Sequence, residues 1–238
     1  MNKIGIIGAM EEEVAALKSD MLEITVKHKA QMEFYNGLLR EKKVVVVRSG
    51  IGKVNAAVCA QILIDDFQVD AILNTGIAGS LRSDINMADI VVSTDALQHD
   101  VDAREFGHPL GQIPRMDVLS FPADSKLIEQ AIRSCKKVNP EINVFTGRIV
   151  TGDQFVADSN RKEEIVAHFD GYCTEMEGAA IAQVAYLNKI PFVIIRAISD
   201  QADGNAQMDF PLFMEQAIAN SVRLVVDMIG GLGKWQSM

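Results

Sequence analysis

The residues with the clearest potential for chemistry lie at the end of an apolar stretch that runs from Ile190 to Asp200. The first half of this stretch is apolar and β-branched, which is typical of a strand buried on both faces of a sheet. Arg196, Ser199 and Asp200 then interrupt the pattern, and their burial is unfavourable unless they meet one another, solvent or a ligand. Ligands bind at the carboxyl ends of strands in open α/β sheets, so these residues mark a candidate site. A buried Arg196–Asp200 ion pair that only ties the strand to its loop explains them equally well.

A second group, Glu175-Met-Glu177, lies one helix upstream, and Glu13 follows the first apolar stretch of the chain. Carboxylates that converge raise one another's pKa, which allows a protonated donor to lie beside an ionised base. Paired carboxyl groups suit glycosidic bond cleavage, in which one acid assists the leaving group and the other activates water. Phe155 and Met176 would suit a flat heterocycle with an apolar substituent. The residues alone therefore indicate a glycosidic or nucleoside hydrolase.

The acidic triplet Glu11-Glu-Glu13 has a simpler interpretation. Acidic side chains stabilise a helix N-terminus through its partial positive charge, so all three could serve the helix that begins there. Three successive residues of a helix point in three directions, however, so one of them can face the crevice above the preceding strand.

Alternating strands and helices are expected to position these groups. Buried strands are predicted at residues 3–9, 43–49, 70–74, 87–94, 143–151 and 190–200, and an edge strand at 31–40. Helices are predicted from the triplet onward and at 54–67, 124–137, 159–169, 178–188 and 209–229, the last with Pro211 in its first turn. This order predicts one three-layer αβα domain over residues 1–238, with a flexible tail from about 230.

Two glycine-containing segments are expected to be turns after strands. Gly50-Ile-Gly-Lys-Val-Asn55 lacks the third glycine of a dinucleotide fingerprint and the Ser or Thr of a phosphate-binding loop, so it predicts only a tight strand-to-helix turn. The turn Thr75-Gly-Ile-Ala-Gly79 has small residues that allow a ligand or another backbone to come close.

The segment from His99 to Gln112 has no period and is typical of a functional lid or an interface arm. His99 stands near Asp100 and Asp102, but nothing else completes a set of metal ligands.

Composition narrows the class of protein. Of the 238 residues 48% are hydrophobic and 23% charged, as in ordinary globular domains. The net charge of -9 argues against a nucleic-acid binder. The three cysteines, Cys59, Cys135 and Cys173, form neither a CxxC motif nor an even set, which favours buried thiols in a reducing compartment. No apolar run is long enough to span a membrane, and the N-terminal apolar stretch is too short for a signal sequence. A cytoplasmic location is expected.

Five motifs in this order make the chain resemble a known family. They are Gly5-Ile-Ile-Gly-Ala-Met-Glu-Glu-Glu13, Ser49-Gly-Ile-Gly-Lys53, Asn74-Thr-Gly-Ile-Ala-Gly79, Glu175-Met-Glu177 and Arg196-Ala-Ile-Ser-Asp200. Together they closely resemble the bacterial 5'-methylthioadenosine/S-adenosylhomocysteine nucleosidases of the purine nucleoside phosphorylase superfamily, over roughly residues 3–229. The resemblance implies an αβα sandwich around a mixed sheet, no metal or cofactor, and a homodimer that binds neither nucleic acid nor membrane. It also implies hydrolysis of these two nucleosides and of 5'-deoxyadenosine, in methionine salvage and the recycling of S-adenosylmethionine by-products.

The same resemblance implies a role for each site residue. Asp200 would protonate N7 of adenine, and Glu13 would activate the water that Arg196 and Glu175 help to place. Glu177 would bind the ribose hydroxyls. The residues expected at the substrate are Ile51, Ala78, Gly79, Phe106, His108, Phe155, Val156, Met176, Glu177, Ser199 and Phe210. Among them, Phe155 would stack on adenine, and Phe106 would reach the 5' pocket of the partner subunit.

Two positions depart from the family pattern. Ile77 stands where some members have Ser, which puts one contact to the water in doubt, and His108 stands where Tyr is common, which puts the preferred 5' substituent in doubt. Three alternatives stay open: a phosphorylase, which the triplet Glu11–Glu13 disfavours because it would repel phosphate, a hydrolase of aminodeoxyfutalosine, and an inactive adenosine sensor.

Overall fold

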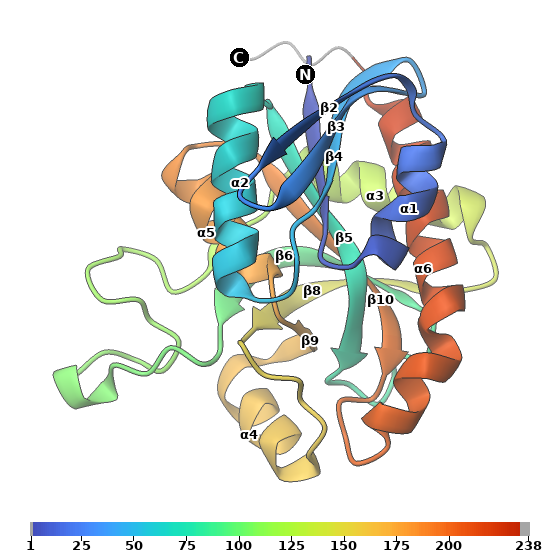
Figure 1. Cartoon of the computed structure of the whole chain (residues 1–238). Helices are drawn as coiled ribbons and strands as arrows, with labels where there is room; N and C mark the ends of the chain where they lie inside the picture. Colours follow the sequence, from blue (N-terminus) through green and yellow to red (C-terminus); the bar gives the residue numbers. More distant parts are fainter. Residues whose placement is uncertain (1, 234–238) are drawn as a thin grey trace.

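A computed structural model describes residues 2–233 of the chain as a mixed sheet with helices on both faces (Figure 1). The strands are β1 (Ile4–Gly8), β2 (Leu22–Lys29), β3 (Met32–Leu39), β4 (Lys42–Arg48), β5 (Ala71–Ser80), β6 (Ile90–Gln98), β7 (Phe121–Pro122), β8 (Val144–Thr151), β9 (Gly171–Glu175) and β10 (Phe192–Asp200). The helices are α1 (Glu11–Ser19), α2 (Lys53–Phe67), α3 (Ser125–Val138), α4 (Ser159–Phe169), α5 (Gly178–Leu187) and α6 (Ala206–Gly231).

The strand order is β10-β6-β8-β9-β5-β1-β4-β3-β2, with β7 paired to β6. Strand β5 also pairs with β10 in parallel, so the strands β5, β10, β6, β8 and β9 form a closed circuit from which β1, β4, β3 and β2 extend. Strands β1, β4, β5 and β10 run parallel to their neighbours in this central region, and therefore end at the same edge. The apolar runs predicted at 3–9, 43–49 and 190–200 end at that edge, whereas β6 runs antiparallel to β10.

Helices cover both faces of the sheet, which confirms the three-layer prediction. On one face α2 and α5 pack over apolar side chains of β1, β5 and β10, including Ile7, Ile72 and Ile194. On the other face α1, α3 and α6 cover a second cluster that includes Ile6 and Leu73 (Figure 1). Because alternate residues of each strand point to opposite faces, strands that are buried on both faces must be apolar throughout. All five residues of β1 are buried.

Three boundary predictions were wrong. The edge strand of the sheet is β2, which the sequence analysis did not identify, and the strand predicted at 31–40 is its inner neighbour β3. The segment 75–79 is no turn, because β5 continues in pairing with β10 and β9 up to Ser80. Helix α6 begins at Ala206, so Pro211 lies inside it; the amides of Met208 and Asp209 close an earlier first turn on the carbonyl of Asn205.

The expected tail overlaps the end of this last helix. Gly230 and Gly231 belong to α6, and Leu232 is buried. Residues 234–238 lie outside the described residues. No helix within residues 2–233 has the length and apolar character to cross a bilayer.

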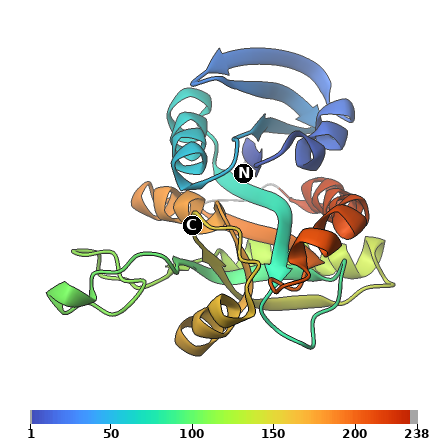
Figure 2. The ribbon, with the colours of Figure 1, turned by 60° about the horizontal axis from the view of Figure 1, so that its bottom comes forward.

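The aperiodic segment after β6 is an arm that projects from the body of the molecule (Figure 2). Its only regular element in the described chain is a 3-10 turn over Arg104–Phe106, and Phe106 at its tip is 85% exposed. A large aromatic side chain this exposed is typical of an interface.

Candidate active site

A cavity of about 550 Å³ opens at the carboxyl ends of β1, β5, β9 and β10. Its lining includes the predicted residues Glu13, Ile51, Ala78, Gly79, Phe155, Val156, Glu175, Met176, Glu177, Ser199, Asp200 and Phe210. The carboxyl ends of these strands therefore bring together residues that are far apart in sequence. Polar side chains and carboxylates share this cavity with aromatic and aliphatic ones, as in small-molecule sites.

Asp200 is buried at the end of β10 and has no contact with Arg196. Its Oδ2 accepts a hydrogen bond from the Ser199 hydroxyl at 2.8 Å, and its Oδ1 accepts one from the Ala202 amide at 2.8 Å. Burial raises the pKa of Asp200, with smaller contributions from Asp209 and Asp203, against these two hydrogen bonds. The structural alternative of an Arg196–Asp200 ion pair is thus wrong, because Arg196 is bound to Asn74 and Glu175 instead.

Glu13 is the one member of the acidic triplet that lines the cavity, while Glu11 and Glu12 are exposed. Its Oε2 accepts hydrogen bonds from the amides of Ala9 (2.7 Å) and Met10 (2.9 Å), and its Oε1 accepts one from Ile77 (3.1 Å). Burial raises the pKa of Glu13, while the nearby Arg196 and the three amides oppose this effect. The side chain is therefore fixed in place, with its proton affinity increased.

Two glycines of β5 make room for the carboxylates. A Cβ at Gly76 would lie 2.6 Å from Oε1 of Glu13, and a Cβ at Gly79 would lie 2.6 Å from Oδ1 of Asp200. Both distances are far below van der Waals contact, so any other residue would push the acids away. The sequence analysis expected a ligand or another backbone to come close here; the groups that do so in this chain are carboxylate side chains, and a strand rather than a turn provides the space.

Arg196 lies beneath the cavity and joins two strands. Its Nη2 donates to Oδ1 of Asn74 in β5 and to Oε2 of Glu175 in β9. Glu175 also accepts hydrogen bonds from the Thr151 hydroxyl and from the amides of Glu177 (3.1 Å) and Gly178 (2.7 Å). Since these bonds occupy both of its oxygens, Glu175 caps helix α5 and holds Arg196 in place.

Glu177 is buried, and burial together with Glu175 raises its pKa to about 7. Its Oε1 accepts a hydrogen bond from the Gly52 amide at 2.8 Å. Within the described part of the chain its other oxygen accepts none, so this carboxyl group can still bind a hydroxyl.

Aromatic side chains form the mouth of the cavity. Phe155 is half exposed and meets Phe210 edge to face, with ring centroids 6.1 Å apart and planes at 88°. Ile51 lines the same region. An exposed ring that is held by a second ring offers a flat surface on which a heterocycle can stack.

Of the residues expected at the substrate, this chain does not bring Phe106 and His108 to its own cavity, because both lie on the projecting arm. The sequence analysis also missed four lining residues, Ala9, Met10, Thr174 and Gln207. Gln207 lies in the first turn of α6, ahead of the predicted start of that helix. Thr174 directly precedes the Glu175 motif in the sequence, and this position was the available signal.

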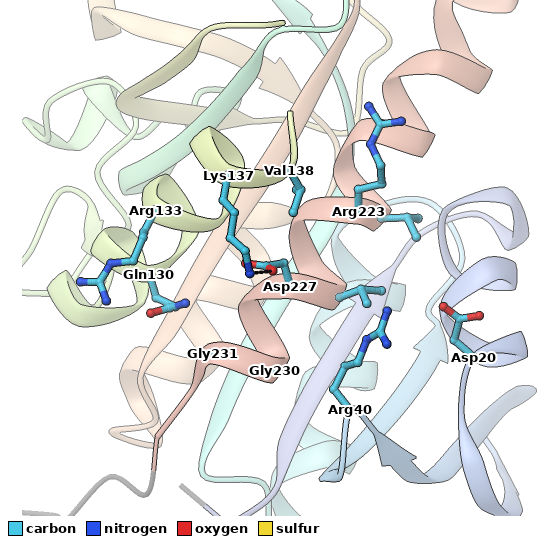
Figure 3. Close-up of a pocket in the computed structure, with 12 residues that line it drawn as sticks. Asp20, Arg40, Gln130, Arg133, Lys137, Val138, Arg223, Asp227, Gly230 and Gly231 are labelled. Atoms are coloured by element: carbon cyan, nitrogen blue, oxygen red, sulfur yellow. Dashed lines mark hydrogen bonds and ion pairs between the residues drawn. The ribbon is translucent and has the colours of Figure 1, made fainter. Parts of the chain in front are cut away.

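A cavity of about 640 Å³ between α3 and α6 is larger but lacks this chemistry (Figure 3). Lys137 is paired with Asp227 at 2.6 Å, and Arg223 donates to Glu141 and to two asparagines. Arg133 points away from the centre of the cavity in Figure 3. Two of the four cations that line this cavity, Lys137 and Arg223, are therefore already paired with carboxylates, and no acids converge there.

Metal ligands do not gather at any point of the described chain, where no group of three His, Cys, Asp or Glu side chains could hold an ion. Burial lowers the pKa of His99 to about 4, so its imidazole is neutral at pH 7. Its Nδ1 lies 3.4 Å from Arg161.

Comparisons with known proteins agree with this geometry. A family model described as the phosphorylase superfamily matches residues 3–230. A 5'-methylthioadenosine/S-adenosylhomocysteine nucleosidase from an Exiguobacterium species is 46% identical over 228 residues, which are 94% of this chain and 96% of that one. The structure of the Neisseria meningitidis nucleosidase of the same name, in complex with methylthio-immucillin-A, has a TM-score of 0.94 and 39% identity, covering 98% of this chain and 100% of that one. A futalosine hydrolase of Helicobacter pylori has a TM-score of 0.92 and 34% identity, covering 97% of this chain and 98% of that one.

Proposed function

The chain belongs to the phosphorylase superfamily and, within it, to the 5'-methylthioadenosine/S-adenosylhomocysteine nucleosidases, and we propose on this premise that it hydrolyses the N-glycosidic bond of both nucleosides. It is then an N-glycosyl hydrolase that releases adenine and a 5'-substituted ribose. The observation that carries the proposal is the presence of two buried acids, Glu13 and Asp200, in one cavity. 5'-Deoxyadenosine, which has the same base and sugar and a smaller 5' end, is a further expected substrate.

Asp200 is the proposed general acid. Adenine leaves poorly as an anion, and a proton on N7 removes the charge that would develop on the ring. A carboxyl group with a raised pKa retains a proton more readily than an ordinary aspartate, and burial provides this at Asp200. Ser199 donates to Oδ2 of Asp200, which fixes the orientation of the carboxyl plane.

Glu13 is the proposed general base for the attacking water. The attacking water approaches the ribose on the side opposite to the leaving adenine. The fixed oxygens of Glu13 can accept a proton from this water as positive charge develops at the anomeric carbon. Arg196, which Glu175 and Asn74 hold in place, compensates the negative charge around this water. Ile77 contributes its amide to Glu13, a contact that needs no side-chain hydroxyl. The absence of Ser at this position therefore leaves the base in place.

The remaining contacts follow the shape of a thioether nucleoside. We assign the ribose hydroxyls to Glu177 and the sugar face to Met176. Adenine stacks on Phe155 and meets the backbone of Val156, while Ala78 and Gly79 line the floor. Ile51 and Phe210 surround the 5'-alkylthio group, and Phe106 and His108 of the partner subunit complete that end of the pocket in a homodimer.

A second cavity of about 560 Å³ adjoins the first and shares Ala9, Met10 and Ile51 with it. Its lining carries charges of both signs, with Glu11, Glu12 and Arg48. Arg48 has no closer carboxylate in the described chain than Glu11, at 3.9 Å. This space can accept the amino-acid end of S-adenosylhomocysteine, which carries an ammonium and a carboxylate.

Hydrolysis is favoured over phosphorolysis by the charge of the site. The buried Glu13 carboxyl group lies where an attacking phosphate would have to approach, and Arg196 is already compensated by Glu175. The test is to follow the sugar product from methylthioadenosine with and without phosphate. Free methylthioribose at an unchanged rate is expected in both cases. Formation of the sugar 1-phosphate would exclude the hydrolase mechanism.

The likeness to a futalosine hydrolase supports a second candidate substrate, since aminodeoxyfutalosine carries adenine and ribose as well. Adenine release from aminodeoxyfutalosine, compared with methylthioadenosine on the same enzyme preparation, distinguishes the two activities. We expect methylthioadenosine to have the higher kcat/KM, because Ile51 and Phe210 offer an apolar surface to its 5' group. A higher value for aminodeoxyfutalosine would reverse the assignment. A cytoplasmic location is proposed because methylthioadenosine and S-adenosylhomocysteine both arise from S-adenosylmethionine-dependent reactions in the cytoplasm.

A further inference from the structure

Three residues from three separate segments, the start of helix α2 and the loops after β6 and β8, form a closed ring of hydrogen bonds beside the cavity. Lys53 donates through Nζ to Oδ1 of Asp100 at 2.7 Å, and its backbone amide donates to Oδ1 of Asp153 at 2.8 Å. The amide of Asp153 donates to Oδ2 of Asp100 at 3.0 Å, which closes the ring. Gln98 accepts a further hydrogen bond from Lys53 Nζ at 3.0 Å.

Each member of the ring belongs to a segment with its own place at the site. Lys53 follows Gly52, whose amide binds Glu177 at 2.8 Å. Asp153 begins the loop that carries Phe155 to the mouth of the cavity. Asp100 begins the arm after β6. The ring therefore joins the ribose side of the cavity, the adenine side and the arm.

The position of Lys53 is unfavourable for the helix that it begins. A cation in the first turn of a helix opposes the partial positive charge there, and α2 has no acidic residue in that turn to compensate. Gly52, the cap residue, has no side chain that could accept from the first amides, so Asp153 from another loop supplies the acceptor. Helix stability alone would favour another residue at position 53, which indicates that Lys53 is required by the contacts of the ring.

The ring is also largely shielded from solvent. The side chains of Lys53 and Asp100 are 19% and 16% exposed. Burial raises the pKa of Asp100, but the hydrogen bonds from Lys53 and from the Asp153 amide outweigh burial and leave this pKa below its usual value. The carboxylate therefore stays ionised at neutral pH, and its hydrogen bond with Lys53 is charge-assisted, which makes it stronger and more directional than a neutral one.

We propose that Lys53, Asp100 and Asp153 form a positioning ring that holds the adenine-stacking loop and the Gly52 amide at a fixed separation, and that ties both to the arm. This inference rests on the proposed function of the cavity. Its members touch no substrate. They act through Phe155 on the base and through Glu177 on the ribose, so they affect the binding of substrate more than the chemical step.

The test compares Lys53→Met, Asp100→Asn and the double variant with wild type, using methylthioadenosine as substrate and adenine as ligand. We expect KM and the dissociation constant of adenine to rise by about tenfold in each single variant, with kcat within about threefold. Because both substitutions break the same ring, the double variant should resemble the worse single variant, which a double-mutant cycle measures. Lys53→Arg, which keeps the positive charge, should retain more of the affinity than Lys53→Met.

Lys29→Met is the matched control. Lys29 lies away from the cavity and forms an exposed ion pair with Asp66, with 2.9 Å between Nζ and Oδ2. It should leave KM and adenine binding unchanged. The proposal is overturned if the ring variants keep wild-type adenine affinity, if their effects add, or if melting temperature falls while KM stays constant. Failure of wild type to release adenine from methylthioadenosine would instead refute the proposed function. Because adenine binding is measured without turnover, it tests the ring separately from that function.

Discussion

Asp200 has a raised pKa because it is buried, and this effect outweighs the hydrogen bonds from Ser199 and the Ala202 amide, which favour the ionised form. Asp200→Asn keeps the shape of the side chain but has no acid proton to transfer. We predict that kcat for methylthioadenosine falls by at least ~10²-fold, the effect typical of losing a general acid, while substrate affinity is largely kept. Steady-state kinetics and adenine titration on a folded variant check this. A kcat within a few fold of wild type would show that Asp200 is structural.

Glu177 makes the stability of the free protein depend on pH. Its pKa is about 7 in the folded chain, raised by burial and by Glu175 from 4.5. Between these two values the unfolded chain loses the proton that the folded chain keeps, so the free energy of unfolding falls as pH rises through this window. Glu177→Gln has no proton to lose and should gain stability relative to wild type on the order of 2 kcal/mol between pH 4 and pH 8. Denaturant unfolding at both pH values measures this, and an equal difference at both would contradict it.

Arg48 should distinguish the two main substrates. It lines the adjoining cavity and not the cavity that holds Glu13 and Asp200. Arg48→Gln is predicted to lower kcat/KM for S-adenosylhomocysteine by about three- to tenfold, the loss of one partly exposed charge-assisted contact. Methylthioadenosine, which has no charged 5' end, should be unaffected and serves as the internal control. Equal changes for both substrates would mean that the amino-acid end lies elsewhere.

At this scale the sequence was informative where polar residues interrupt apolar strands. Glu175 and Asp200 could be found because each ends a buried strand, where a polar side chain is unfavourable without a purpose, and Glu13 because it follows one. The partner of Arg196 could not be found in this way. Asp200 is closer to Arg196 in sequence. Asn74, however, lies on β5, which pairs with β10, and Glu175 lies on β9, which pairs with β5. Only the register of the sheet brings these two residues into contact with Arg196.

At the level of elements, strand β5 has no room for added volume beside the carboxylates. A Cβ at Gly76 would also lie 3.0 Å from Nη1 of Arg196. Gly76→Ala should therefore displace Glu13 and lower kcat/KM by at least about tenfold, at a stability loss of about 1–3 kcal/mol from overpacking. Gly204→Ala is the control, since nothing lies within 4 Å of its Cβ. Wild-type activity in Gly76→Ala would show that the base tolerates movement.

Element boundaries were harder to predict than element types. In β2 the apolar residues Leu22, Ile24 and Val26 alternate with polar ones, which is a strand pattern that could have been found. All eight residues of β2 are exposed, however, so burial imposes little on its sequence. The start of α6 was misplaced because Pro211 is typical of a first turn, whereas this helix tolerates it one turn later.

At the level of the whole molecule, the arm is the feature that a single chain leaves without a role. Phe106→Ala is predicted to raise KM for methylthioadenosine more than for adenosine, because adenosine lacks the apolar 5' group that the aromatic ring would contact. Wild type should sediment as a dimer. Equal effects on the two substrates, or a monomeric wild-type protein at assay concentration, would argue against the contribution of Phe106 across subunits.

The place of β10 in the sheet has a consequence for protein synthesis. It is the last strand to be translated, yet it lies between β5 and β6 and closes the circuit of strands. Until it leaves the ribosome, the nascent chain exposes the edges of both neighbours, and such edges readily pair with other chains. The long sequence separation between β5 and β10 also makes their pairing slow. A newly made chain therefore completes its sheet and acquires Arg196 and Asp200 in the same late event, so an incomplete translation product is both inactive and prone to aggregate.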